Sequence, residues 1–385
     1  MARASVGGET VVQPRSQAEV AQVLERARSQ GRVVSIRGGG TKTGFGRAAP
    51  DDPLILETLG LDRLLEHRPE DLVVRAEAGM RLGALEAILL GRGQTLGWDV
   101  PGGDEATVGG AIAAGVEGAL AGRHRLRDDV LEVRARLATG VEVRHGAPVV
   151  KNVAGYELPR LWVGSMGALG VIEAVTLRVR PRPERSVTHR RLLPDAAARG
   201  EWLARLGRVD PEAAALVWPA GGDLAGLVVL SGRSRQVDAW LGALGPGEIL
   251  EGDAGQRAVA SALAPAPCRL FLAMEPSRCF EALEAARARV GPVAASADLL
   301  TGWIRVEADP RAVDPQALGA DADHPYRWEG AARLLGRRPV TGPPGPADAL
   351  VLRVLDAFDP ERRFDRDRLI PPADPGVGSP GTGPS

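Results

Sequence analysis

The chain has 385 residues, more than one ordinary hydrophobic core accommodates, so we expect two packed units and a tail. Its 48 lysine and arginine residues nearly balance its 49 aspartate and glutamate residues, which argues against nucleic acid or an anionic membrane surface as the main partner. The two cysteines, Cys268 and Cys279, are spaced neither as metal ligands nor as a redox pair, and no segment approaches the roughly 18 consecutive apolar residues of a membrane span. We therefore expect a cytoplasmic protein without a bound metal.

The first hundred residues alternate between strand and helix. Residues 10–12 predict a short strand, and Ser16 with Glu19 forms a capping-box pattern that opens a helix. A buried strand over 33–36 leads directly into a glycine loop. A strand over 72–76 and a helix over 82–90 then repeat the same order.

The rest of the chain is richer in strands. Paired prolines at Pro181 and Pro183 predict a boundary, because proline interrupts both helix and sheet hydrogen bonding. Strands and helices alternate beyond it as in an α+β domain. After residue 98 we expect strands over 130–137, 141–144, 171–179, 215–218, 227–230, 269–273 and 303–307, and helices over 236–244, 279–290 and 347–358.

Two glycine-rich segments could bind a ligand. In the loop from Gly38 to Gly46, glycines let backbone amides converge on an anion and Lys42 adds a positive charge, but neither a P-loop ending nor Gly-x-Gly-x-x-Gly spacing is present. The stretch from Pro101 to Gly115 lets a flat ligand approach the main chain, with Thr107 at the start of a short helix. Taken alone, the loop from Gly38 to Gly46 could equally be a surface turn. The stretch from Pro101 to Gly115 could instead reflect tight helix packing.

A third segment, Lys151 to Tyr156, gathers residue types that the chain otherwise avoids. The chain has two lysines, Lys42 and Lys151, one asparagine, Asn152, and two tyrosines. A second glycine pattern, Gly-Ser-Met-Gly-Ala-Leu-Gly-Val, follows over residues 164–171. Either these rare residues have a specific function or they cluster by chance.

In this order, the glycine loop, Pro-Gly with Thr-Val-Gly-Gly, Lys-Asn-Val-Ala-Gly-Tyr and Gly-Ser-x-Gly-x-Leu-Gly-Val resemble the FAD-binding domain of the vanillyl-alcohol oxidase, or PCMH, type. More narrowly, Lys151 to Tyr156 with Arg160 and Leu161 is similar to the FAD-binding subunits E of bacterial glycolate oxidase (glycolate dehydrogenase). The resemblance covers about residues 10–184.

The resemblance implies an α+β fold, with a two-lobed PCMH-type FAD-binding domain and a smaller α+β cap domain. The expected FAD-binding domain spans residues 1–184, with lobes of about 1–95 and 96–184. A cap domain over 185–345 follows. Residues 346–370 would return to the FAD-binding domain, and 371–385 have the proline, glycine and serine composition of a disordered tail.

The resemblance also implies the cofactor contacts. The loop starting at Gly38 would hold the pyrophosphate of FAD, and the later segments would line the isoalloxazine and ribityl side. Some relatives attach the flavin through a histidine in the first loop, but Thr41, Lys42 and Thr43 stand there, so we expect non-covalent FAD. The expected contacts are Gly38, Gly39, Gly40, Thr41, Lys42, Thr43, Gly44, Pro101, Gly102, Thr107, Gly109, Gly110, Lys151, Gly155, Tyr156, Gly167 and Ile172.

No catalytic group stands out. Oxidation of a 2-hydroxy acid at a flavin needs a base for the hydroxyl proton and a cation for the carboxylate. The five histidines are scattered, and we expect each at the surface or in a turn. Tyr156, Arg160 and His324 stay open as substrate-side groups. The chain departs from the family pattern in the segments from Gly122 to Leu126 and from Phe364 to Arg368.

The missing catalytic motifs favour a division of labour. We expect an FAD-binding subunit of a glycolate oxidase-like complex, which oxidises glycolate to glyoxylate, with this chain taking part in electron transfer. The expected partners are a catalytic flavoprotein subunit and an iron–sulfur subunit, since two cysteines cannot hold a cluster. Any membrane association would be peripheral and through these partners. The alternatives are a self-sufficient FAD-dependent 2-hydroxy acid dehydrogenase of the D-lactate kind, a non-catalytic flavin-fold scaffold and, less favoured, a nicotinamide enzyme.

Overall fold

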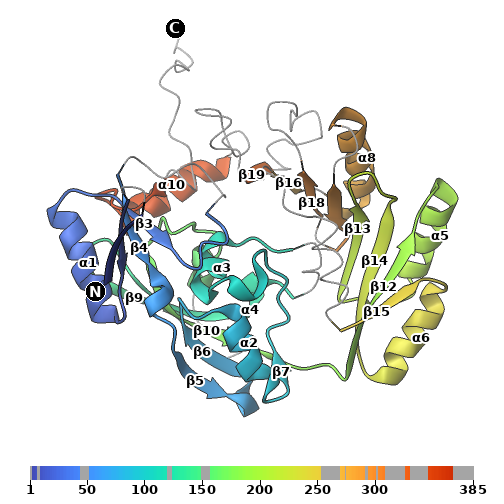
Figure 1. Ribbon diagram of the computed structural model, residues 1–385, viewed down its shortest axis with the longest axis horizontal. Coiled ribbons are helices and arrows are strands. Elements are labelled where there is room, and N and C mark those ends of the chain that lie inside the picture. Colours follow the sequence, from blue (N-terminus) through green and yellow to red (C-terminus); the bar gives the residue numbers. More distant parts are fainter. Residues whose placement is uncertain are drawn as a thin grey trace, which may run out of the picture.

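The computed structural model contains two units that lie side by side (Figure 1). We call residues up to 182 together with 346–366 the N-terminal unit, and residues 185–329 the cap unit. The chain crosses between them through the proline pair near residue 182. The structure describes residues 2–6, 9–43, 52–118, 124–148, 157–252, 269–273, 275–290, 294–300, 302–307, 326–329 and 346–366.

A four-stranded sheet with one helix opens the N-terminal unit. Its elements are β1 (Ala2–Val6), β2 (Glu9–Gln13), α1 (Gln17–Ser29), β3 (Val34–Arg37) and β4 (Leu54–Glu57). The strand order is β1-β2-β4-β3, and β3 runs parallel to β4, so both strands end at the same edge. The Ser16 hydroxyl accepts a 3.2 Å hydrogen bond from the amide of Glu19, which confirms the predicted cap of α1.

A five-stranded antiparallel sheet of order β5-β6-β10-β8-β9 forms the rest of this unit. Its elements are β5 (Leu64–Arg68), β6 (Val73–Glu77), α2 (Leu82–Leu90), α3 (Val108–Ala114), α4 (Leu126–Asp129), β8 (Val130–Arg136), β9 (Glu142–Gly146) and β10 (Val171–Arg178), with the short pair β7 (Gln94–Thr95) and β11 (Arg180–Pro181). Helices α2 and α3 bury apolar side chains such as Leu85 and Ile112 in the core of this unit. Strand β6 pairs with β10, so this sheet takes its strands from residues on both sides of Thr95.

The cap unit is an eight-stranded sheet of order β15-β12-β14-β13-β17-β18-β16-β19. Its elements are β12 (Arg185–Leu192), α5 (Ala196–Leu206), β13 (Ala213–Trp218), β14 (Ala225–Gly232), α6 (Ser234–Leu244), β15 (Glu248–Glu251), β16 (Arg269–Ala273), α8 (Cys279–Val290), β17 (Ala295–Asp298), β18 (Trp303–Glu307) and β19 (Tyr326–Glu329). The three helices cover the sheet face that points away from the N-terminal unit (Figure 1). Trp202, Leu230 and Leu283 belong to the apolar core of this layer.

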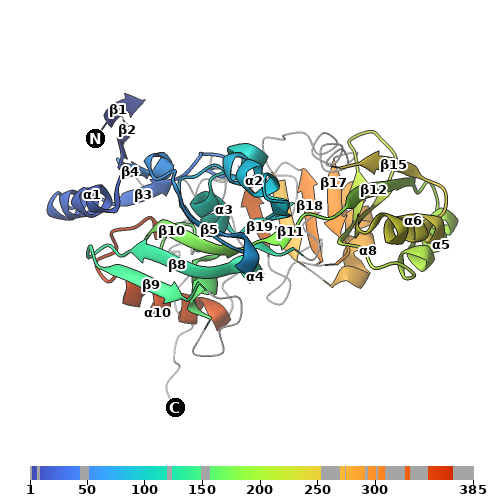
Figure 2. The same cartoon turned by 90° about the horizontal axis from the view of Figure 1, so that it is seen from below.

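The chain finally returns to the N-terminal unit through α10 (Pro346–Phe358). The Phe358 ring lies 6.0 Å from that of Trp162 and 5.9 Å from that of His145 on β9, beside which Figure 2 shows α10. Phe364 then forms a parallel bridge with Val34. The C-terminal segment is therefore attached to β3, the strand that leads into the glycine loop.

Short 3-10 turns connect several of these elements. They are η1 (Thr58–Gly60), η2 (Pro69–Asp71), η3 (Gly103–Glu105), η4 (Leu158–Trp162) and η5 (Pro276–Arg278). Within the described segments, no helix has the length and hydropathy needed to span a bilayer. The mixture of helices and antiparallel and parallel strands confirms the α+β class expected from the sequence.

Candidate functional site

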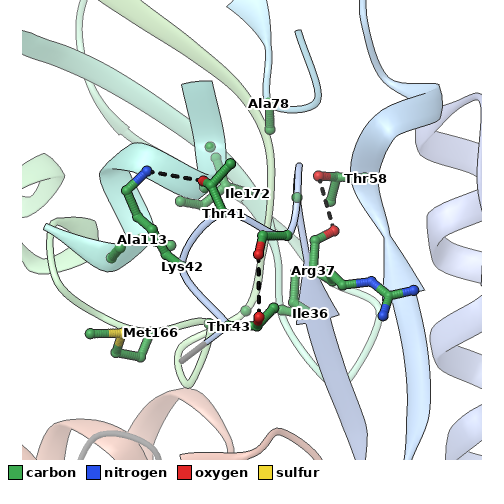
Figure 3. Close-up of a pocket in the computed structure, with 17 residues that line it drawn as sticks. Ile36, Arg37, Thr41, Lys42, Thr43, Thr58, Ala78, Ala113, Met166 and Ile172 are labelled. Atoms are coloured by element: carbon green, nitrogen blue, oxygen red, sulfur yellow. Dashed lines mark hydrogen bonds between the residues drawn. The ribbon is translucent and has the colours of Figure 1, made fainter. Parts of the chain in front are cut away.

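A pocket opens in the N-terminal unit where β3, α3 and the start of β10 meet (Figure 3). The space inside it, open solvent at its mouth included, is about 660 Å³. The expected contact residues that line it are Gly38, Gly40, Thr41, Lys42, Thr43, Gly109, Gly110, Gly167 and Ile172. The lining residues that the sequence did not reveal are Ile36, Arg37, Thr58, Ala78, Ala113, Ala114, Met166 and Gly170.

The glycine loop fits closely against the segment that follows Pro101. A Cβ added to Gly38 would collide with the hydroxyl of Thr107, and one added to Gly39 would collide with the carbonyl oxygen of Glu105. Gly102 has a φ of +87°, and a Cβ there would lie 2.5 Å from the Cβ of Thr41. Glycine is required at these positions because any side chain there would strike Thr107, Glu105 or Thr41 and push the two segments apart.

Helix α3 forms the floor of the pocket. The hydroxyl of Thr107 caps this helix by accepting a 3.2 Å hydrogen bond from the amide of Gly110. A Cβ at Gly109 would lie 2.6 Å from the Cβ of Ala78, so this glycine allows α3 to pack on the end of β6. Thr107 is 1% exposed and stands behind Gly38, where it supports the loop.

The third side of the pocket comes from the turn before β10. The amides of Gly164 and Met166 donate to the carbonyl oxygens of Ile112 and Ala113, at 2.9 and 2.8 Å, and thus bind the turn to the C-terminal end of α3. Met166 has a φ of +53°, an unfavourable conformation for a residue with a side chain. Gly167 follows with a φ of +80° and lies against Ile36. The turn thereby brings two separate glycine patterns to one pocket.

Positive charge and hydroxyl groups gather on one side of the pocket. The ammonium of Lys42 donates to the hydroxyl of Thr41 at 3.3 Å, and the hydroxyl of Thr43 donates to the carbonyl oxygen of Gly40 at 3.2 Å. Arg37 is paired with Glu57 at 3.1 Å, and Figure 3 shows its guanidinium turned away from Lys42. Lys42, the threonine hydroxyls and the loop amides suit a phosphate-containing ligand.

Several predicted site residues lie elsewhere. Gly39, Pro101, Gly102 and Thr107 are described by the structure but do not line the pocket. Arg160, a substrate-side candidate, forms ion pairs of 3.2 Å with Asp128 and 2.9 Å with Glu157. The residues outside the described segments are Gly44, Lys151, Gly155, Tyr156 and His324.

The expectation that every histidine lies at the surface or in a turn is wrong for His189. This side chain is 1% exposed in β12, where Nε2 bonds to the carbonyl oxygen of Gly245 at 3.1 Å. His145 lies in β9, and its Nδ1 accepts a 2.9 Å hydrogen bond from the indole of Trp162. Burial lowers the pKa of both histidines. In the described part of the chain, no group of three His, Cys, Asp or Glu residues is arranged to hold a metal ion.

Residues 9–146 match the family model of the FAD binding domain. The chain is 39% identical over 185 residues to the glycolate oxidase subunit GlcE of Escherichia coli K12, an overlap of 46% of this chain and 50% of that protein. It is 34% identical over 173 residues to a D-lactate dehydrogenase of Archaeoglobus fulgidus, covering 45% of this chain and 39% of that enzyme. The chain thus spans half or less of the length of these curated relatives.

A solved structure of alkyldihydroxyacetonephosphate synthase has the same fold. It aligns with 94% of this chain and 78% of its own, with a TM-score of 0.67 at 15% sequence identity. The described helices and strands are therefore arranged in an established fold. The resemblance found in the sequence is confirmed: residues 9–146 of this chain match the FAD binding domain family, of the PCMH type.

Proposed function

We propose that this chain is the FAD-binding subunit of a glycolate oxidase-like complex, an FAD-dependent oxidoreductase that converts glycolate, a 2-hydroxy acid, to glyoxylate. The observation that carries the proposal is the pocket in which the glycine loop, α3 and the turn before β10 converge. The 39% identity to GlcE over 185 residues supports glycolate as the substrate of the complex.

In this proposal the residues from Gly38 to Gly44 hold the pyrophosphate of a non-covalently bound FAD. Lys42 supplies the positive charge, and Thr41 and Thr43 supply hydroxyl donors. Bound FAD provides a two-electron acceptor, and the protein orients it and controls its surroundings. The proposed contacts on the isoalloxazine and ribityl side are Pro101, Gly102, Thr107, Gly109, Gly110, Lys151, Gly155, Tyr156, Gly167 and Ile172.

The proposal includes a division of labour among subunits. A second flavoprotein subunit would oxidise glycolate, and an iron–sulfur subunit would carry the electrons onward. This chain would contribute its flavin to assembly or electron transfer. We further propose that the FAD-binding domain spans residues 1–184, with the cap domain over 185–345 and residues 346–370 returning to the first domain.

A second candidate is a self-sufficient D-lactate dehydrogenase, favoured by the 34% identity to a D-lactate dehydrogenase over 173 residues. Dye reduction by the purified chain separates the two functions. The subunit proposal expects no glycolate or D-lactate turnover by the chain alone, and glycolate turnover once the partner subunits are added. D-lactate turnover without partners supports the second candidate. Glycolate turnover without partners would remove the need for a division of labour.

A further inference from the structure

Residues 358–364, at the end of α10 and just beyond it, pack against two walls of the pocket, and we call them the C-terminal brace. The ring of Phe358 lies edge-on to that of Trp162, with 6.0 Å between the ring centres and 75° between the planes. Trp162 is fully buried, and its carbonyl oxygen accepts a 3.3 Å hydrogen bond from the amide of Ser165. The aromatic contact therefore anchors the start of the turn that supplies Met166 to the pocket.

The indole of Trp162 also contacts the far end of that turn. A Cβ added to Gly170 would lie 3.3 Å from this ring, and Gly170 itself lines the pocket. The indole N–H donates to Nδ1 of His145 at 2.9 Å, which fixes the orientation of the ring. Phe358 thus packs on a side chain that touches the turn before β10 at both of its ends.

A buried carboxyl group turns the chain from α10 toward β3. Asp359 is 1% exposed, and its two oxygens accept hydrogen bonds from the amides of Arg363 and Phe364, at 2.9 and 2.8 Å. Arg362, inside this turn, has a φ of +53°, an unfavourable conformation for a residue with a side chain. The bonds from the side chain of Asp359 to the backbone hold the turn in this conformation and direct Phe364 to β3.

The second wall that the brace contacts is β3, the last strand in the order β1-β2-β4-β3. The amide of Val34 donates to the carbonyl oxygen of Arg363 at 2.7 Å, and the amide of Asp365 donates to the carbonyl oxygen of Val34 at 3.3 Å. The side chain of Phe364 is 2% exposed and belongs to the apolar cluster that contains Val34, against which Ile36 packs. The brace therefore covers the outer edge of the strand that carries the glycine loop.

We propose that Phe358, Asp359 and Phe364 are positioning residues of the FAD site, because the brace holds β3 and the turn before β10 at the spacing that the cofactor requires. The two walls meet where Gly167 of the turn lies against Ile36 of β3, and both of these residues line the pocket. The three brace residues lie outside the lining and act through the walls. A preorganised pocket binds more tightly, since less ordering is left to binding. The inference rests on the proposed function, which places FAD in this pocket.

The first test measures the affinity of the full-length, flavin-free chain for FAD. Phe358→Ala and Phe364→Ala each release one wall, and we expect each to raise the Kd about tenfold, as when the binding-competent form falls to about one molecule in ten. The matched control is Leu283→Ala, which removes a buried side chain from the cap-unit core and should leave the Kd within about twofold of wild type. A wild-type Kd in both phenylalanine variants, or an equal rise in Leu283→Ala, would overturn the proposal.

The second test measures amide hydrogen exchange in the same flavin-free variants by mass spectrometry. Phe364→Ala should speed exchange in peptides containing residues 34–37, and Phe358→Ala in those containing residues 164–168, while other strands keep their wild-type rates. Phe364→Leu, which keeps an apolar side chain, should restore most of the protection and replaces the alanine variant if that one does not fold. Unchanged exchange at both walls, or uniformly faster exchange, would refute the brace. If the wild-type chain binds no FAD, the proposed function fails, and the exchange pattern still decides whether the brace holds the two walls.

Discussion

The two units use their glycines for different purposes. In the N-terminal unit, Gly38, Gly39 and Gly102 allow the glycine loop and the segment after Pro101 to pack closely beside the pocket. In the cap unit, Gly226 makes room for the indole of Trp202, which packs into an apolar core. The difference teaches that the glycines of the N-terminal unit let two distant chain segments approach each other beside the pocket. A glycine beneath a large side chain matters for packing alone.

The units also differ in where they place their charges. The N-terminal unit encloses Asp129, which is fully buried and accepts hydrogen bonds from Trp98, Arg178 and Arg180. In the cap unit, Arg185 pairs with Asp238, whose side chain is 65% exposed. A buried, multiply bonded carboxylate and an exposed one should respond very differently to removal.

The largest expected effect follows from this contrast. Asp129→Ala leaves two arginines and an indole N–H without their buried acceptor, and we expect a loss of about 3–5 kcal/mol in unfolding free energy. Asp238→Ala in the cap unit should cost about 1 kcal/mol or less, because water replaces the lost partner. Urea unfolding of both variants measures the difference. Equal losses of unfolding free energy in the two variants would show that the buried Asp129 network stabilises the protein no more than the exposed ion pair does.

The next effect tests the glycine contacts directly. Gly102 and Gly103 both have positive φ, but an added Cβ would strike Thr41 only at Gly102 and would meet no atom within 4 Å at Gly103. Gly102→Ala should therefore push the glycine loop away and weaken FAD binding about tenfold or more, since each 1.4 kcal/mol of strain corresponds to a factor of ten. Gly103→Ala is the matched control, with backbone strain alone. Fluorescence titration with FAD measures both, and equal affinities would contradict a closely fitted cradle.

The sequence predicted the parts of the fold that depend on local pattern. Helix α2 spans 82–90 as expected, because its apolar residues recur at helical spacing and a glycine follows. Strand β12 was missed because polar residues interrupt its apolar pattern: Arg185 and Arg191 are partly buried and pair with acidic side chains of the cap unit. Such pairing depends on tertiary structure and leaves no periodic signal.

The residues of the candidate site likewise fall into those that a local sequence pattern predicted and those that it did not. Glycine patterns identified the loop, α3 and Gly167, since glycine is required where backbones approach closely. Met166, Thr58 and Ala78 were missed because ordinary residue types enter the pocket only through the packing of distant segments. The role of the segment from Lys151 to Tyr156 stays a prediction, because it lies outside the described residues.

A smaller effect concerns acid stability in each unit. Burial lowers the pKa of His145 in the N-terminal unit and of His189 in the cap unit, so the unfolded chain binds protons more readily than the native one. Their contribution to stability is complete above the unfolded histidine pKa of about 6.5 and is lost as the pH falls through the lowered native values. His145→Gln and His189→Gln should each flatten the fall in Tm between neutral and mildly acidic pH. An unchanged slope in either variant would contradict this assignment for its unit.

The smallest effect concerns the cap unit alone. Burial raises the pKa of the Cys279 thiol to about 12, and this side chain is fully enclosed. We expect iodoacetamide to leave Cys279 unmodified in the native protein at pH 8, because the thiolate is the reactive form. Peptide mapping by mass spectrometry checks this, with a urea-unfolded sample as the positive control. Rapid native modification would show that the core around α8 opens readily.

The central claim is that the pocket between β3, α3 and β10 binds FAD. The most direct measurement is a titration of the purified, flavin-free chain with FAD. Two readouts monitor binding: flavin fluorescence, and the rise in Tm that a ligand of the native state produces. The account predicts saturable binding of one FAD and a Tm that increases with FAD concentration, both weakened by Lys42→Ala. Absence of binding, or equally tight binding by Lys42→Ala and Gly102→Ala, would contradict it.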